Sequence, residues 1–138
     1  MTELFMLDTN TVSYLVKGRS AAARRSMYGL RPHQNACIST IVEGELLYWL
    51  AKRPEATSLR LATEAFLRTV TILQWGREEA AVYGRLRAKQ EANGRILDHF
   101  DLMIAAHAIA TGSILVSSDK VFRQVNDLPG LVDWATDL

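Results

Sequence analysis

The chain has 138 residues, enough for a compact domain with a hydrophobic core, and we expect one domain over residues 1–138. Hydrophobic residues make up 49% of the sequence and charged residues 22%, which excludes disordered and collagen-like classes. No apolar run approaches the ~20 residues that span a bilayer, and residues 1–7 lack the basic start of a signal peptide. We therefore expect a cytoplasmic protein with no membrane contact. The only cysteine, Cys37, lies in an apolar run and is predicted to be buried and unreactive.

Charge is distributed unevenly along the chain, although the formal net charge is only +1. If a metal neutralised four of the fifteen acidic side chains, the sixteen basic side chains would exceed the rest by five. Residues 9–42 contain no Asp or Glu but carry Lys17, Arg19, Arg24, Arg25 and Arg31. Such a stretch is typical either of an ordinary solvated face or of a surface that binds a polyanion.

Short apolar runs alternate with stretches of helical periodicity from the beginning of the chain to its end. Continuous apolar runs predict buried strands, which we place at residues 4–7, 36–39, 70–74, 114–116 and 131–134. Helices are expected from the turn at 8–10 to about residue 16, where Gly18 stops the first, and then at 21–28, 40–52, 57–69, 77–93 and 98–111. This alternation predicts an α/β fold, a three-layer α/β/α sandwich with a mainly parallel central sheet. Ligands bind such sheets beyond the carboxyl ends of the strands.

Two of the predicted strands are followed by polar residues that include an aspartate. Asp8 comes directly after the first strand, and Asp119 comes three residues after the strand at 114–116. A single aspartate at such a position commonly caps the next helix. Two at equivalent strand ends favour a shared acidic site.

Glu45 lies within the helix at residues 40–52, among apolar residues at helical spacings of three and four. A carboxylate on an apolar face is costly unless it is paired or bound to a cation. Its neighbour Glu43 fits a capping box with Thr40 as the N-cap, so we assign Glu43 to capping and Glu45 to the site.

Asp98 and Asp101 form a similar pair. Asp98 is expected to cap the helix at 98–111, whereas Asp101 begins the buried face that continues through Ile104 and Ala108. His107, on the same helix, is expected to be a packing or surface residue.

Four clustered carboxylates persist only if they take up protons or bind a hard cation, and oxygen ligands select Mg²⁺ or Mn²⁺. Such ions can activate water against a phosphodiester. The sequence offers no Ser–His–Asp or Cys–His arrangement and no nucleotide-binding glycine loop.

The order of these motifs resembles the PIN-domain nucleases, and more narrowly the VapC-like toxins of bacterial type II toxin–antitoxin pairs. The resemblance covers nearly the whole chain. It is carried by Leu7-Asp8-Thr9-Asn10, Ile38-Ser39-Thr40, Glu45-Leu46, Asp101 before Ile104-Ala105-Ala106-His107-Ala108, and Leu115-Val116-Ser117-Ser118-Asp119 with Phe122 following.

The resemblance implies a ribonuclease whose catalytic acids are Asp8, Glu45, Asp101 and Asp119, the two strand-end aspartates and Asp101 being the metal ligands. It also implies that Asn10 orients the first acid or a bound water and that Ser117 supports the site. The implied partners are RNA and a cognate antitoxin, and the implied assembly is a homodimer or a toxin–antitoxin hetero-oligomer. As the toxin of the pair, the chain would inhibit translation and growth, and the antitoxin would inhibit the toxin. Two departures are Tyr48-Trp49, where the family often has Gly shortly after Glu-Leu, and Asp98, where it often has Gly. Asp98 adds a fifth acid that could contribute at the edge of the site.

Two other functions stay open at this point. The first is a phosphatase or phosphotransferase with Asp8 as the covalent nucleophile, although such sites usually have a second Asp where this chain has Asn10. The second is a non-catalytic module that binds RNA or protein. For RNA contact we favour Arg24 and Arg25, and the alternative is the basic group on the helix at 77–93, Arg85, Arg87 and Lys89.

Overall fold

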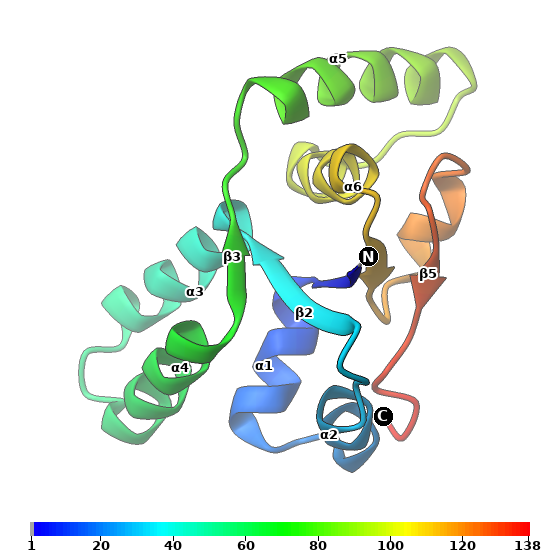
Figure 1. The fold of residues 1–138 in the computed structure, drawn as a ribbon. Coiled ribbons are helices and arrows are strands. Elements are labelled where there is room, and N and C mark those ends of the chain that lie inside the picture. Colours follow the sequence, from blue (N-terminus) through cyan, green and yellow to red (C-terminus); the bar gives the residue numbers. More distant parts are fainter. Residues whose placement is uncertain (1) are drawn as a thin grey trace.

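The centre of the protein is a five-stranded parallel sheet with strand order β3-β2-β1-β4-β5. The structure is a computed structural model that describes residues 2–138; Met1, with which the predicted domain begins, lies outside the described residues. The strands are β1 (Glu3–Leu7), β2 (Gln34–Ser39), β3 (Thr71–Leu73), β4 (Ile114–Val116) and β5 (Leu131–Val132). Figure 1 shows them side by side, with the helices placed around them.

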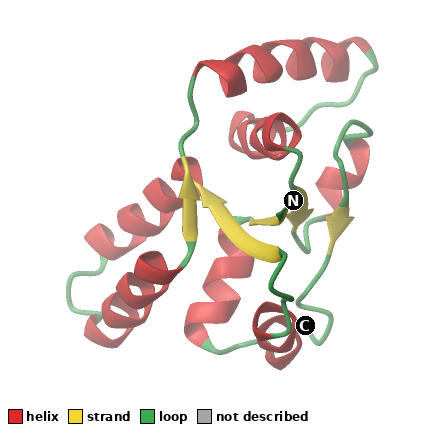
Figure 2. Ribbon diagram, in the orientation of Figure 1, coloured by secondary structure: helices red, strands yellow, loops and turns green. Residues whose placement is uncertain are grey.

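Helices cover both faces of this sheet, and Figure 2 shows the strands enclosed by them. Helix α5 packs against α6 on one side of the sheet, whereas α1 contacts α2, α3 and α4 on the other side (Figure 1). The helices are α1 (Thr9–Lys17), α2 (Ala21–Tyr28), α3 (Thr40–Lys52), α4 (Thr57–Thr69), α5 (Arg77–Ala92), α6 (His99–Thr111) and the short 3₁₀ helix η1 (Lys120–Gln124). The predicted three-layer α/β/α sandwich is therefore confirmed.

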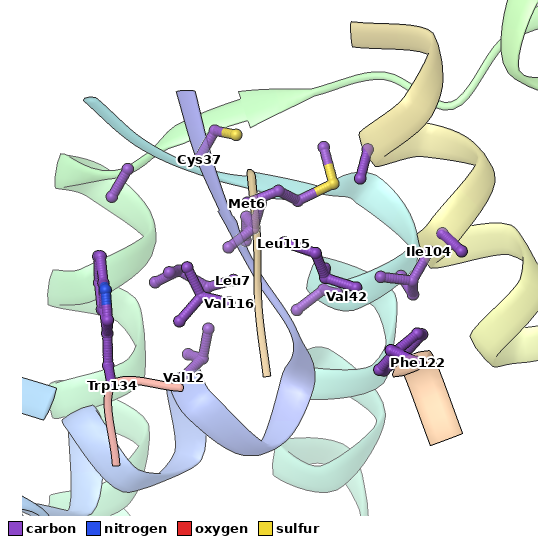
Figure 3. Packing of buried hydrophobic residues seen from close by; sticks show 14 of the residues in the cluster. Met6, Leu7, Val12, Cys37, Val42, Ile104, Leu115, Val116, Phe122 and Trp134 are labelled. Atoms are coloured by element: carbon purple, nitrogen blue, oxygen red, sulfur yellow. The ribbon is translucent and has the colours of Figure 1, made fainter. Parts of the chain in front are cut away.

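The hydrophobic core lies on both faces of the neighbouring strands β1 and β4, which we call the two central strands. Consecutive residues on a strand point to opposite faces, and the neighbours Met6 and Leu7 are both fully buried. Leu115 and Val116 on β4 are fully buried as well, and Figure 3 shows these four side chains among the core residues of the helices. A strand buried on both faces needs a continuous apolar run, which is why β1 and β4 were readable from the sequence.

Helix ends follow the local capping chemistry that the sequence predicts. Gly18 and Gly112 adopt left-handed backbone with φ of 64° and 66° and close α1 and α6. One predicted N-cap was wrong. Ser39, not Thr40, is the N-cap of α3, and its hydroxyl accepts the N–H of Ile41. The Thr40 hydroxyl instead accepts a hydrogen bond of 3.2 Å from the backbone N–H of Trp75, so Glu43 is not part of a capping box with Thr40.

The structure also bears on two further predictions, the burial of Cys37 and the extent of the last strand. Cys37 is fully buried, as predicted, and burial raises the pKa of its thiol to about 11, which disfavours the reactive thiolate. The last strand was predicted at 131–134 and is shorter, because β5 holds only Leu131 and Val132. None of the helices within residues 2–138 combines the length and the apolarity needed to cross a membrane.

Candidate metal-binding active site

The predicted acids gather where the direction of the chain through the sheet reverses. Connections from β1 proceed to β2 and then β3, whereas the path after β3 returns to β4 on the other side of β1. Such a switch point leaves a crevice at the carboxyl ends of the two central strands. Asp8 directly follows β1, and Asp119 follows β4, so both aspartates lie at this edge.

Asp8 combines a capping role with a place in the site. One of its carboxylate oxygens, Oδ1, accepts the backbone N–H of Thr11 at 2.9 Å and so caps α1. The Thr11 hydroxyl in turn donates to the carbonyl of Val116 at 3.2 Å, which ties the start of α1 to the end of β4. Asp8 is only 7% exposed, and burial raises the pKa of its carboxyl above the ordinary value.

Ser117 connects the two strand-end aspartates. Its hydroxyl oxygen accepts the backbone N–H of Asp119 at 3.0 Å, and a hydrogen bond between its side chain and Asp8 partly offsets the rise in the Asp8 pKa. Asp119 itself is exposed and accepts the N–H of Val121 at 3.0 Å, which caps η1. Ser117 therefore lies beside both strand-end aspartates, and its supporting role stays a prediction.

Asp101 reaches the same crevice from the first turn of α6. Its pKa is raised to about 6, first by burial and then by the charges of Asp98 and Asp119, with a smaller contribution from Asp8. Asp98 caps α6 by accepting the N–H of Asp101 at 2.8 Å. The charges of Asp8 and Asp119, which come from two other parts of the sequence, therefore act on Asp101.

Glu45 completes the set from α3, where it is half-buried. All four predicted acids line one cavity of about 170 Å³. Its remaining walls come from Thr9, Asn10, Trp49, Phe100, Ile104 and Phe122. The structure thus brings the four acids and Asn10 together, and it leaves Asp98 and Ser117 beside the cavity.

The side chains that line the acidic cavity offer mainly oxygen atoms as ligands for a divalent cation. Within residues 2–138, no group of three or more acidic, His or Cys side chains is arranged closely enough to enclose an ion directly. Mg²⁺ keeps several of its waters and commonly uses only one or two carboxylates, so a wider acidic cavity suits a hydrated ion. Thr9 also lines this cavity, and its buried hydroxyl has no hydrogen-bond partner among the described residues. The residues therefore fit a hydrated Mg²⁺ or Mn²⁺.

Sequence reasoning missed the apolar walls of the site. Trp49, Phe100 and Phe122 line the cavity beside the acids. Trp49 stands one helical turn after Glu45, and that spacing was the available signal. Arg24 and Arg25 lie exposed on α2, and Arg24 lines a different cavity, so their contact with RNA stays a prediction.

Comparisons with known proteins agree with this geometry. The profile of the PIN domain family matches residues 5–128. Ribonuclease VapC2 of Haemophilus influenzae is 37% identical over 126 residues, covering 88% of this chain and 91% of the relative. A tRNA(fMet)-specific endonuclease VapC of Shigella flexneri is 31% identical and covers 95% of this chain and 98% of its own.

Solved structures give the same relationship. VapBC2 from Rickettsia felis, crystallised with a DNA fragment from its promoter, superposes with a TM-score of 0.87 at 29% identity, over 95% of this chain and 98% of that one. DNA-bound VapBC from Salmonella typhimurium gives a TM-score of 0.86 at 28% identity, over 97% and 99%. With the profile match, the near full-length identity and the acidic crevice in agreement, the chain belongs to the PIN domain family and groups there with the VapC ribonucleases.

Proposed function

We propose that residues 1–138 act as one nuclease domain, a Mg²⁺- or Mn²⁺-dependent endoribonuclease and the toxin of a type II toxin–antitoxin pair. The observation that carries this proposal is the convergence of Asp8, Glu45, Asp101 and Asp119 on one cavity at the switch point of the sheet. Relatives named as VapC ribonucleases support the RNA substrate. Cleavage of RNA in the cytoplasm would inhibit translation and growth.

Asp8, Asp101 and Asp119 would hold the ion, and Glu45 would face it from α3. A bound divalent ion supplies Lewis-acid activation of water and neutralises charge on the phosphodiester. The protein contributes the positions of the carboxylates: helix caps anchor Asp8 and Asp119, and the hydroxyl of Ser117 accepts the backbone N–H of Asp119. Asn10, which lines the same cavity, would orient Asp8 or a water.

A cognate antitoxin is the proposed protein partner, because two of the similar structures are VapBC complexes. An apolar groove of about 310 Å³ between α1, α2 and α4 offers a surface for it. Phe66 and Met27 line this groove, and the nearby Tyr28 is 82% exposed. A partner that covers the groove would complete a toxin–antitoxin hetero-oligomer; a homodimer is the alternative assembly.

The decisive experiment incubates purified protein with single-stranded RNA and Mn²⁺ or Mg²⁺, with and without EDTA. The wild type should cleave the RNA, and EDTA or Asp8→Asn should lower the rate by at least about a hundredfold. Asp8→Asn keeps a side chain that can cap α1, so a loss of activity reports the lost charge rather than a lost helix. Cleavage that survives EDTA would contradict the metal-dependent mechanism.

The other two functions give different results in the same preparation. A phosphatase with Asp8 as nucleophile would form an acid-stable phosphoaspartate at Asp8, which a hydrolytic nuclease would not form. A non-catalytic binding module would retain RNA without cleaving it at any metal concentration.

A further inference from the structure

A second, basic cavity adjoins the acidic one. It has a volume of about 260 Å³ and is lined by Lys17, Trp49, Lys52, Arg53 and Leu59. These residues come from the last turn of α1, the last turns of α3 and the beginning of α4. We call this cavity the basic pocket. Trp49 lines both the basic pocket and the acidic cavity, so the two share a wall.

The cations of the basic pocket are not neutralised by the protein. Within residues 2–138 the only ion pairs are Arg87–Glu91 and Lys89–Asp127, both of which include a residue of α5. The Nζ atoms of Lys17 and Lys52 lie instead against aromatic rings, 6.0 Å from the centroid of Trp49 and 5.2 Å from that of Tyr48. A cation held by an aromatic face keeps its full charge and stays available to an anion.

The two cavities follow one helix. Glu45 and Trp49 are four residues apart on α3 and therefore lie on the same face, about 6 Å apart along the axis. Arg53 follows at the same spacing, at the end of the helix. A strand whose phosphate lies among the acids can continue along α3 and reach the basic pocket within one or two helical turns.

Positive charge beside an accessible aromatic ring is the chemistry that binds single-stranded nucleic acid. Lysine and arginine contact backbone phosphates, and unstacked bases lie against aromatic faces. We propose that the basic pocket is a nucleotide subsite, in which Lys17, Lys52 and Arg53 bind a phosphate flanking the cleaved bond and Trp49 stacks on the adjoining base. This inference rests on the proposed ribonuclease function, because the shared wall at Trp49 is what assigns RNA rather than another polyanion.

The subsite is tested by the salt dependence of binding to a short single-stranded RNA, measured by fluorescence anisotropy in EDTA so that the RNA stays intact. Lys52→Ala with Arg53→Ala should weaken binding on the order of tenfold at low salt. It should also reduce the slope of log K against log salt by about 0.7 for each phosphate contact removed. The matched control is Arg68→Ala with Arg77→Ala, two exposed cations on α4 and α5, which should leave the slope unchanged.

Stacking is tested separately with two substitutions of Trp49. Trp49→Leu should weaken RNA binding on the order of tenfold, whereas Trp49→Phe should stay within about twofold because it keeps an aromatic face. Equal affinities for both variants would overturn the stacking role. If the paired substitution of Lys52 and Arg53 lowers the folding yield, Lys17→Ala gives the same comparison from the other side of the pocket.

The outcomes separate this inference from the proposed function. Wild-type protein that cleaves RNA, together with an unchanged salt slope for the Lys52 and Arg53 variant, would overturn the subsite alone. Wild-type protein that never cleaves RNA would overturn the proposed function. The Lys52 and Arg53 variant could bind RNA normally and yet lose a protein that co-purifies with the wild type. That result would assign the basic pocket to the co-purifying protein instead of RNA.

Discussion

Asp98 accepts a hydrogen bond of 2.8 Å from the backbone N–H of Asp101, so the carboxylate that caps α6 lies beside a carboxylate that faces the acidic cavity. The same contact that fixes the helix end places two negative charges together. It is one reason why the pKa of Asp101 is raised to about 6.

Asp98→Asn should lower the pKa of Asp101 below about 6, because it removes the neighbouring charge while asparagine still caps the helix. The pKa is measured in EDTA from the ¹³C shift of the Asp101 carboxyl as pH is varied. Asp98→Ala, which removes cap and charge together, is the control for helix fraying. An Asp101 pKa that stays at about 6 in Asp98→Asn would exclude Asp98 as a cause and leave burial and the charges of Asp119 and Asp8.

Without metal, Asp8→Asn should stabilise the protein near pH 7. Burial raises the folded-state pKa of Asp8, so the folded protein favours the protonated carboxyl below that pKa, and the ionised carboxylate costs stability once the pH rises through it. Removing the charge should raise Tm by a few degrees in EDTA. Thermal unfolding followed by circular dichroism measures the change.

Added Mg²⁺ should then reverse the order of stability. A ligand at about a hundred times its Kd stabilises the folded state by about 2.7 kcal/mol, and this applies only to a protein that binds it. Wild type should therefore gain Tm with Mg²⁺ while Asp8→Asn gains much less. Equal gains for the two proteins would place the ion outside the acidic cavity.

His107 should make the fold sensitive to acid. Its imidazole is fully buried, and both ring nitrogens lack a hydrogen-bond partner among the described residues. Burial lowers its pKa, so its contribution is present above the unfolded-state pKa near 6.5 and is lost as pH falls toward the folded-state value. In that window the unfolding free energy should fall by up to about 1.4 kcal/mol per pH unit.

His107→Leu isolates this contribution from the acids of the site. The variant removes two unsatisfied buried nitrogens and should be at least as stable as wild type near pH 7.5. Urea unfolding between about pH 7.5 and about pH 5 should show a smaller loss of stability for the variant than for wild type. Parallel curves for the two proteins would exclude His107 as the acid-sensitive group.

Two glutamates on α3 give a matched pair for catalysis. Glu45 lines the acidic cavity and Glu43 does not, although both are half-buried and lie two residues apart. Glu45→Gln should lower the cleavage rate by roughly 10–100-fold, as expected when a carboxylate near a metal loses its charge. Glu43→Gln should stay within about twofold of wild type, and a comparable loss for both would implicate helix α3 rather than the site.

The elements that were predicted most closely are those whose signals are local. The bounds of α2, α3, α4 and β4 match the expected ranges, because helical periodicity and apolar runs are visible in neighbouring residues. The cap of α3 was wrong because Ser39 and Thr40 can both cap a helix, and a distant contact with Trp75 decides between them. The helix η1 was missed, because a single 3₁₀ turn has little periodicity.

The acids of the site could be predicted from the order of strands, whereas the apolar walls of the site depend on tertiary packing. Asp8 and Asp119 follow buried strands, so topology alone places them at one edge. Phe100, Phe122 and Trp49 are apolar residues like many others, and only the packing of three separate elements turns them toward the cavity. The family resemblance supplied Asp101, whose position the local pattern left open.

The central place of β1 in the sheet has a consequence for synthesis on the ribosome. The hydrogen bond between Thr11 and Val116 joins residues 105 positions apart, and β4 can pair with β1 only after that whole stretch has been translated. The nascent chain therefore carries Asp8 long before Asp119 exists to face it. The acidic cavity is therefore complete only after the residues through Asp119 have been synthesised and β4 has paired with β1.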